Sequence, residues 1–186
     1  LPKRIFAYWL SNRLRKILTE CPKLGEKTQC CFGLHSHGND DKLFRAWWEV
    51  SQDPYFTDSW PVVRLGGKPE HFYRDSHYVV NWHTNGKALR EIASRAKGGT
   101  LVGSDFYFKK GLSYIYTAQT TFSVQPLEKL SIFTAAAHGC FPPSQSAFLP
   151  CLAFLNSEAV RLLLKVINPD RFFQSAYVKL LPAPTN

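Results

Sequence analysis

Cysteine and histidine side chains gather in the first part of the sequence, where they could bind a metal ion. The set comprises Cys21, Cys30, Cys31, His35 and His37. Structural zinc sites usually take their thiolates in pairs separated by roughly two to four residues. Cys30 and Cys31 are adjacent and no second cysteine pair follows, so the spacing does not fit zinc. We interpret the thiols as buried or incidental and predict no metal site.

A cysteine nucleophile is the second chemistry that the sequence offers. His138 and Cys140 stand close together, and a thiol beside an imidazole can attack a carbonyl group. No family signature surrounds the pair, and the chain has no Gly-x-Gly fingerprint for a nucleotide cofactor. We therefore predict no catalytic residue and no cofactor in this chain, and keep a stand-alone hydrolase or metalloenzyme only as an alternative.

A third segment partly matches the motif with which amino-methyltransferases hold the target amino group, Asn/Asp-Pro-Pro-aromatic. Asn168-Pro169 begins like this motif, but Asp170 replaces the second proline and Arg171 replaces the aromatic residue. The segment also follows a predicted helix and not a glycine-rich strand. We interpret Asn168-Pro169 as a helix stop.

Basic residues near glycine-rich turns form a pattern that is typical of nucleic-acid binding. The chain has 23 Lys and Arg against 14 Asp and Glu, and its net charge of +9 indicates a polyanionic partner. Lys and Arg neutralise phosphates, while Arg, Asn and Gln read base edges. The candidates from this pattern are Arg64, Lys68, Arg74, Lys109 and Lys110. For any single one of them, a solvated surface position is the alternative.

A polar loop between apolar segments, residues 33–41, is the second candidate interface. Its glycines let a backbone approach a partner closely. The candidate contacts in and next to this loop are His35, Ser36, His37, Asn39 and Lys42. Trp47 and Trp48, which follow, are interpreted as scaffold residues and not as base-stacking groups.

The composition indicates one folded domain of 186 residues, because 45% of them are hydrophobic and 15% aromatic. No apolar run is long enough to span a membrane, and no signal peptide is recognisable. Because the chain begins at Leu1 and contains no Met, we expect a piece of a longer protein. Five cysteines, two of them adjacent, argue against a disulfide framework and for a reducing, cytoplasmic compartment.

Hydrophobic periodicity predicts an α+β fold, in which an irregular antiparallel β-sheet carries the loops and helices flank it at the N- and C-terminal ends. Helices are predicted over 5–18, 87–97 and 148–167, with Ser157 as a candidate N-cap at a break in the last. Strand-like segments are 24–34, 62–63, 78–80 and 114–124, and 43–50 is a strand or a short helix. We expect a single domain, 1–186, made of a lead-in helix (1–22), a β-rich core (23–147) and a C-terminal helical part (148–186).

Four segments, taken in order, resemble the target-recognition region of large adenine-specific DNA methyltransferases of bacterial phage-defence systems, the BREX type in particular. Related regions occur in fused restriction-modification enzymes. The segments are 6–11 with Arg13 and Arg15, 37–50, 106–114, and 152–157 followed by Asn168-Pro169 and Phe173-Gln174. Segment 37–50 resembles the family's Thr-Gly-Asp-Asn-Asp loop running into Arg-Tyr-Trp-Trp-Glu-Val. Together the four segments span nearly the whole chain.

The resemblance implies a module that holds double-stranded DNA and reads bases in the major groove. A separate catalytic domain would bind S-adenosylmethionine and methylate the N6 atom of a flipped adenine. The implied partners are duplex DNA, that catalytic domain and other subunits of the defence system. The resemblance also adds Ser113 and Gln125 to the candidate DNA contacts. His37, the Asn39-Asp40 order and Gln125 depart from the family pattern where base reading is expected.

A protein-docking module is the alternative from another class. The same basic surface could hold partners in a defence complex, or a phage inhibitor that mimics DNA. Duplex binding that weakens steeply with salt separates the two hypotheses, because neutralised phosphates release counterions.

Overall fold

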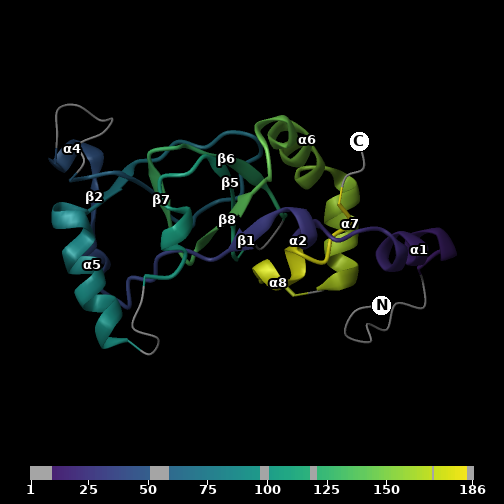
Figure 1. Ribbon diagram of the computed structural model, residues 1–186, viewed down its shortest axis with the longest axis horizontal. Helices are drawn as coiled ribbons and strands as arrows, with labels where there is room; N and C mark the ends of the chain where they lie inside the picture. The colour runs from purple at the N-terminus through teal and green to yellow at the C-terminus, as the bar shows by residue number, and fades with distance from the viewer. Residues whose placement is uncertain (1–9, 51–58, 97–100, 118–120, 169, 184–186) are drawn as a thin grey trace.

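Figure 1 shows the computed structural model, which describes residues 10–50, 59–96, 101–117, 121–168 and 170–183. Its elements in chain order are α1 (Asn12–Glu20), α2 (Leu24–Lys27), β1 (Gln29–Cys31), α3 (Asp40–Leu43), β2 (Phe44–Ala46), α4 (Trp47–Val50), β3 (Val62–Arg64), β4 (Tyr78–Val80), α5 (His83–Arg95), a 3₁₀ helix (Ser104–Phe106), β5 (Gly111–Ile115), β6 (Val124–Leu127), β7 (Ser131–Phe133), β8 (Ala137–Phe141), α6 (Gln145–Leu155), α7 (Glu158–Ile167) and α8 (Ser175–Val178). The predicted α+β class is confirmed.

The first sheet is antiparallel throughout and has the strand order β1-β8-β5-β6. Every residue of β5 and β8 is buried, so these two central strands have lost the alternation that marks a half-exposed strand. β6 forms an edge of this sheet. The predicted strand over 114–124 was partly wrong, because β5 ends at Ile115 and β6 begins only at Val124.

The second sheet has the order β2-β4-β3-β7 and is mixed. β4 runs antiparallel to β2 and β3, but β3 and β7 are parallel, with Val63 opposite Ile132. The expectation of antiparallel pairing was therefore wrong for this pair. The strands predicted at 62–63 and 78–80 are confirmed, in keeping with the preference of paired valines for a pleated surface. Segment 43–50 forms both a strand and a short helix, β2 and then α4.

Two hydrophobic clusters support the sheets. The first packs the first sheet against helices α6, α7 and α8, which surround it at one end of the molecule (Figure 1). The second lies around β3, β7 and helix α5, at the opposite end. The expected N- and C-terminal helices therefore lie at one end of the molecule, and the opposite end is covered by α5, from the middle of the chain. The division of the chain into one domain with three parts stays a prediction.

Capping side chains set the ends of the C-terminal helices. The Ser144 hydroxyl accepts from the Ala147 amide at 3.2 Å and starts α6 at Gln145, before the predicted start at residue 148. The Ser157 hydroxyl accepts from the Val160 amide at 3.3 Å and starts α7, which confirms the predicted break and its cap.

The first elements differ from the prediction. Ser11 caps α1, whose first residue is Asn12 and not residue 5; residues 5–9 of the predicted helix lie outside the described residues. The predicted strand 24–34 contains one turn of helix, α2, before the three residues of β1. Within α5, Thr84, Asn85 and Gly86 have positive φ, so a turn precedes the regular helix, predicted from residue 87, that ends at Arg95. Residue 97, the predicted end of that helix, also lies outside the described residues.

Among the described residues, no single helix is long and apolar enough to cross a bilayer. Helices α6 and α7 reach that length and composition only when taken together, and the pair is bent by 72°.

Candidate nucleic-acid interface

Loops 35–42 and 66–77 are far apart in the sequence but begin side by side in the structure. Leu34 forms a parallel β-bridge with Thr134 immediately before residues 35–42, here called loop 35–42, whose last three residues belong to the short helix α3. The amide and the hydroxyl of Thr134 both donate to the Arg64 carbonyl, at 3.2 and 3.0 Å, just before loop 66–77. Thr134, the residue that follows β7, therefore connects the residues that precede both loops.

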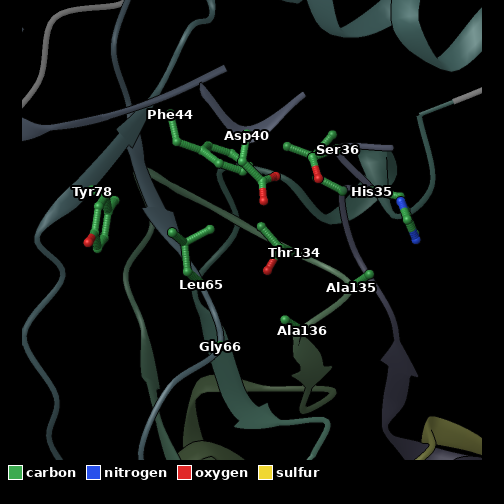
Figure 2. A pocket seen from close by; sticks show the side chains of 11 residues that line it. His35, Ser36, Asp40, Phe44, Leu65, Gly66, Tyr78, Thr134, Ala135 and Ala136 are labelled. Carbon is green, nitrogen blue, oxygen red and sulfur yellow. The ribbon is translucent and has the colours of Figure 1, made fainter. Parts of the chain in front are cut away.

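A pocket of about 500 Å³ lies between these loop starts (Figure 2). Ser36, Asp40 and Thr134 lie around its centre and offer hydroxyl and carboxylate oxygens, while the ring of His35 is turned away from them. The remaining lining residues are mainly apolar: Leu34, Phe44, Leu65, Gly66, Tyr78, Ala135 and Ala136. The pocket thus combines an apolar wall with a few oxygen atoms that accept or donate hydrogen bonds, as is usual for binding sites.

Loop 35–42 is stabilised by its own side chains. The Asn39 amide nitrogen donates to the carbonyls of Ser36 (3.2 Å) and His37 (3.1 Å). The rings of His35 and His37 stack with their centroids 4.4 Å apart. Asn39 is half-buried, whereas both histidines are exposed. Its amide donors are thus engaged within the loop, while the two imidazoles remain accessible to a partner.

A second pocket of about 370 Å³ adjoins the first and shares Leu65 and Tyr78 with it. Three of the predicted DNA contacts, Arg64, Lys68 and Arg74, line this second pocket. Lys68 is exposed. The structure therefore brings together two predicted groups, loop 35–42 and the basic residues of 64–74, that are separated in the sequence.

Arg74 gives loop 66–77 its shape. Its guanidinium donates to the carbonyls of Leu65 (3.1 Å) and Gly66 (2.6 Å). A Cβ atom on Gly67 would lie 2.3 Å from the same guanidinium, so a larger residue there would require the Arg74 side chain to shift. Arg74 is half-buried. Its guanidinium is therefore partly used for hydrogen bonds within the loop and partly accessible at the surface.

Three predicted contacts do not face solvent. Arg64, Ser113 and Gln125 are 7%, 1% and 1% exposed, so the structure does not support direct contact between their side chains and a duplex. The Arg64 guanidinium donates to the carbonyls of Arg74 (2.8 Å) and Pro126 (3.3 Å). Burial, and then the charge of Arg74, lower the pKa of Arg64. Ser113 and Gln125 face each other in the register of β5 and β6.

Hydrogen bonds of Gln125 and Asn156 hold loop 66–77 against the edge of the first sheet. The Gln125 side-chain amide donates to the Glu70 carbonyl. The Asn156 Oδ1 lies 2.9 Å from His71 Nδ1 and accepts from the Val124 amide at 2.9 Å. Gln125 and Asn156 are thus positioning residues, and the loop that they hold carries the exposed side chains.

Charges of both signs surround the two pockets. Lys42 and Lys68 are exposed cations, while Asp40, Glu70 and Asp75 are exposed acids. An aspartate can accept a hydrogen bond from the amino group of cytosine, and a lysine can neutralise a phosphate. The arrangement therefore suits recognition of base edges beside a few phosphate contacts.

Lys109 and Lys110 lie elsewhere. The amide of the neighbouring Phe108 donates to the carbonyl of Ser131 (3.0 Å), at the end of β7 opposite to Thr134. The Lys110 ammonium lies 4.8 Å from the centroid of the Phe148 ring, and both lysines are exposed. Their contact with DNA stays a prediction, and the structure does not join them to the two pockets.

The sequence analysis missed the aromatic residues of this surface. Phe44 and Tyr78 line the first pocket, and Tyr73 lines the second. The exposure of Tyr73 could have been predicted from the sequence, because Tyr73 lies in a turn-rich segment, where few aromatic side chains can pack into a core. The scaffold interpretation of the tryptophan pair also needs correction, because Trp48 is 61% exposed and makes an edge contact with Trp47.

The pair proposed as a nucleophile lies inside the first sheet. Cys140 is fully buried, and its sulfur lies 3.1 Å from that of Cys30. Hydrogen bonds shared with Cys151 and Cys30, and then burial, raise the pKa of the Cys140 thiol. A thiol held in its protonated form and closed off from solvent is a poor nucleophile. All five cysteines are free thiols, and among the described residues no group of three or more His, Cys, Asp or Glu could hold a metal ion.

His138 makes the stability of the domain depend on pH. It is 5% exposed, and burial lowers its pKa from 6.5 to about 4. The folded state keeps His138 neutral, whereas the unfolded state takes up a proton on this residue below pH 6.5. Protonation therefore favours the unfolded state, and the free energy of unfolding falls as the pH drops from 6.5 towards 4. We expect the free energy of unfolding to be about 2 kcal/mol lower at about pH 5 than at about pH 7.5 on account of this residue.

Urea unfolding of the wild type and of His138→Phe at both pH values measures this contribution. The variant should show a pH effect smaller by that amount, because the ring is retained and the titrating group is removed. An unchanged pH effect would show that His138 is not the responsible group.

Comparison with known proteins shows what the chain resembles. No protein-family model matches it. It is 24% identical over 193 aligned positions to the adenine-specific methyltransferase BrxX of Escherichia coli O9:H4 (strain HS), an alignment that covers 100% of this chain and 15% of that protein. It is 23% identical over 198 positions to the adenine-specific methyltransferase PglX of Lacticaseibacillus casei (strain Zhang), covering 98% of this chain and 16% of that protein. The chain is thus similar along its whole length to a small segment of two adenine-specific methyltransferases.

Proposed function

We propose that this chain is the duplex-DNA recognition segment of an adenine-specific DNA methyltransferase that belongs to a phage-defence system. Methyl transfer, and the binding of S-adenosylmethionine, would belong to another part of the same protein. The observation that carries the proposal is the convergence of loops 35–42 and 66–77 on two adjoining pockets. The whole-chain similarity to segments of two adenine-specific methyltransferases supports it.

The chemistry of the converging loops suits a base-reading surface. Asp40 and Ser36 offer a carboxylate and a hydroxyl at the first pocket, and such groups meet the amino groups and acceptors of base edges in the major groove. Lys68 is exposed in the lining of the second pocket and Lys42 is exposed two residues after Asp40, and both can bind phosphates. The net charge of +9 favours approach to a polyanion.

Anisotropy of a labelled duplex, measured at several salt concentrations, tests the proposal. We expect binding that weakens with salt, and a slope of log affinity against log salt that falls by about one for Lys68→Ala and for Lys42→Ala. Lys165→Ala is the matched control, because Lys165 is exposed on α7, away from both pockets, and should leave the slope unchanged.

The same titration can reject the proposal. If the wild-type protein at tens of micromolar shows no duplex binding at low salt, roughly 50 mM, the DNA-recognition proposal fails and the protein-docking alternative gains support. If Lys165→Ala changes the slope while Lys42→Ala and Lys68→Ala do not, the interface lies on the helical end of the molecule.

A further inference from the structure

The tip of loop 66–77 presents two neighbouring aromatic rings to solvent. Phe72 is 54% and Tyr73 71% exposed. The Tyr73 hydroxyl donates to the Asp75 carboxylate. Tyr78, in the same pocket lining as Tyr73, is 47% exposed. The Phe72 ring lies 6.3 Å, centroid to centroid, from the ring of His71. Exposed apolar side chains gathered on one loop indicate an interaction site.

The backbone holds this tip firmly, although its side chains are exposed. The Phe72 amide donates to the carbonyl of Val124 in β6 at 3.2 Å. The two preceding residues, Glu70 and His71, are held by Gln125 and Asn156, both of them buried. A ring carried on a fixed backbone loses little freedom when it binds, so the tip is pre-organised for contact.

Phe72 also adopts a backbone conformation that a bulky residue rarely takes. Its φ is +64°, in the left-handed region where a side chain is disfavoured. Such conformations persist only where surrounding contacts impose them, and they are frequent at binding sites. The contacts of Gln125 and Asn156 hold the two residues directly before Phe72.

The neighbours of the two rings are polar and charged, and Glu70 and Asp75 are exposed acids beside the cations, which favours a nucleic acid over an apolar partner. Lys68 is exposed in the same loop, Arg74 follows Tyr73 directly, and His71 is exposed before Phe72. Flat rings next to cations and polar side chains match the combination with which proteins hold unstacked bases, where the ring covers the base and the cation meets the backbone phosphate.

We propose that Phe72 and Tyr73 form a stacking wedge that covers the faces of nucleobases exposed when the bound duplex opens at one position. The inference rests on the proposed function, since it places the wedge on the DNA that loops 35–42 and 66–77 recognise. An enzyme that acts on a base inside a duplex must take that base out of the stack, which exposes the faces of its neighbours. Aromatic rings can replace the lost stacking regardless of sequence, because every base has a π face.

Two duplexes that differ at one position provide the test. One is fully paired, and the other carries a single abasic site, which exposes base faces. We expect the wild type to bind the abasic duplex about tenfold more tightly than the paired one. Phe72→Leu combined with Tyr73→Leu should remove this preference, because leucine keeps apolar bulk and lacks a stacking face. The salt slope should stay unchanged, because neither ring carries charge.

Matched variants separate stacking from general damage. Phe72→Tyr should keep the preference for the abasic duplex. Phe32→Ala, which removes another exposed ring (44%) outside this loop, should keep it as well. Thermal unfolding of each variant confirms that the domain is folded.

The outcomes distinguish this inference from the proposal on which it rests. If the wild type binds both duplexes with a clear salt dependence but without preference, or if the leucine variant keeps the preference, the wedge is wrong and DNA recognition stands. An equal loss of affinity for both duplexes would also contradict the wedge, because it would place the rings on ordinary duplex surface. If the wild type binds neither duplex, DNA recognition itself fails.

Discussion

Replacing Asn156 by alanine is expected to lower the free energy of unfolding by about 3 to 4 kcal/mol and to loosen loop 66–77. Asn156 is 7% exposed. Its Nδ2 donates to the carbonyls of Val124 (2.8 Å) and Leu152 (3.1 Å), and its Oδ1 accepts from the Val124 amide (2.9 Å). The side-chain amide thus pairs with both backbone groups of Val124 on the edge strand β6, as a neighbouring strand would. Alanine would remove the acceptor of the buried Val124 amide, which is costlier than the loss of the bond alone. The carbonyls of Val124 and Leu152 would keep the backbone amides of Phe72 and residue 156 as donors.

Asn168→Ala is the matched control for this prediction. Asn168 has the same exposure, 7%, but its side chain makes one described hydrogen bond, from Nδ2 to the Phe172 carbonyl at 2.7 Å. We expect a loss of about 1 kcal/mol there. Urea unfolding followed by circular dichroism compares the two variants. Equal losses would contradict the role of Asn156 as the cap of the sheet edge, and unchanged proteolysis of loop 66–77 in Asn156→Ala would contradict its role as the anchor of that loop.

Leu155→Ala is expected to destabilise the domain by about 3 kcal/mol, because it opens a cavity in the first hydrophobic cluster. Leu155 is 0% exposed at the end of α6, whereas Leu149 is 68% exposed on the same helix. Leu149→Ala makes the same chemical change without a cavity and should alter stability by less than about 0.5 kcal/mol. Thermal or urea unfolding of both variants measures the difference. Similar values for the two would mean that α6 does not pack on the sheet through the face that carries Leu155.

Local sequence patterns predicted the elements whose formation depends on local chemistry. Ser157 ends one helix and caps the next because its hydroxyl meets the Val160 amide three residues on, a contact within one turn. The valines at 62–63 and 79–80 lie in strands β3 and β4 of the second sheet, in keeping with the preference of β-branched residues for strands. The parallel pairing of β3 with β7 could not be predicted in this way, because its partners, such as Val63 and Ile132, are far apart in the chain.

The candidate site was also predictable only in part, namely where the properties of a residue depend on its own type and its neighbours in the sequence. The polarity and glycines of loop 35–42 marked it as an exposed loop, and Lys68 is exposed as its charge suggests. Arg64 and Gln125 have residue types that normally remain in water, yet both are buried, since backbone carbonyls accept their hydrogen bonds. Only the tertiary structure shows that these two side chains support loop 66–77 and do not form its outer surface.

The central claim is that loops 35–42 and 66–77 together face duplex DNA, and amide chemical-shift mapping by NMR tests it most directly. The 21.2 kDa chain would be titrated with an unlabelled duplex at low salt, roughly 50 mM. We predict shifts concentrated in these two loops and around Thr134, with α7 (Glu158–Ile167) unaffected. Shifts confined to α1 or α7, or no shifts at tens of micromolar protein, would contradict the account.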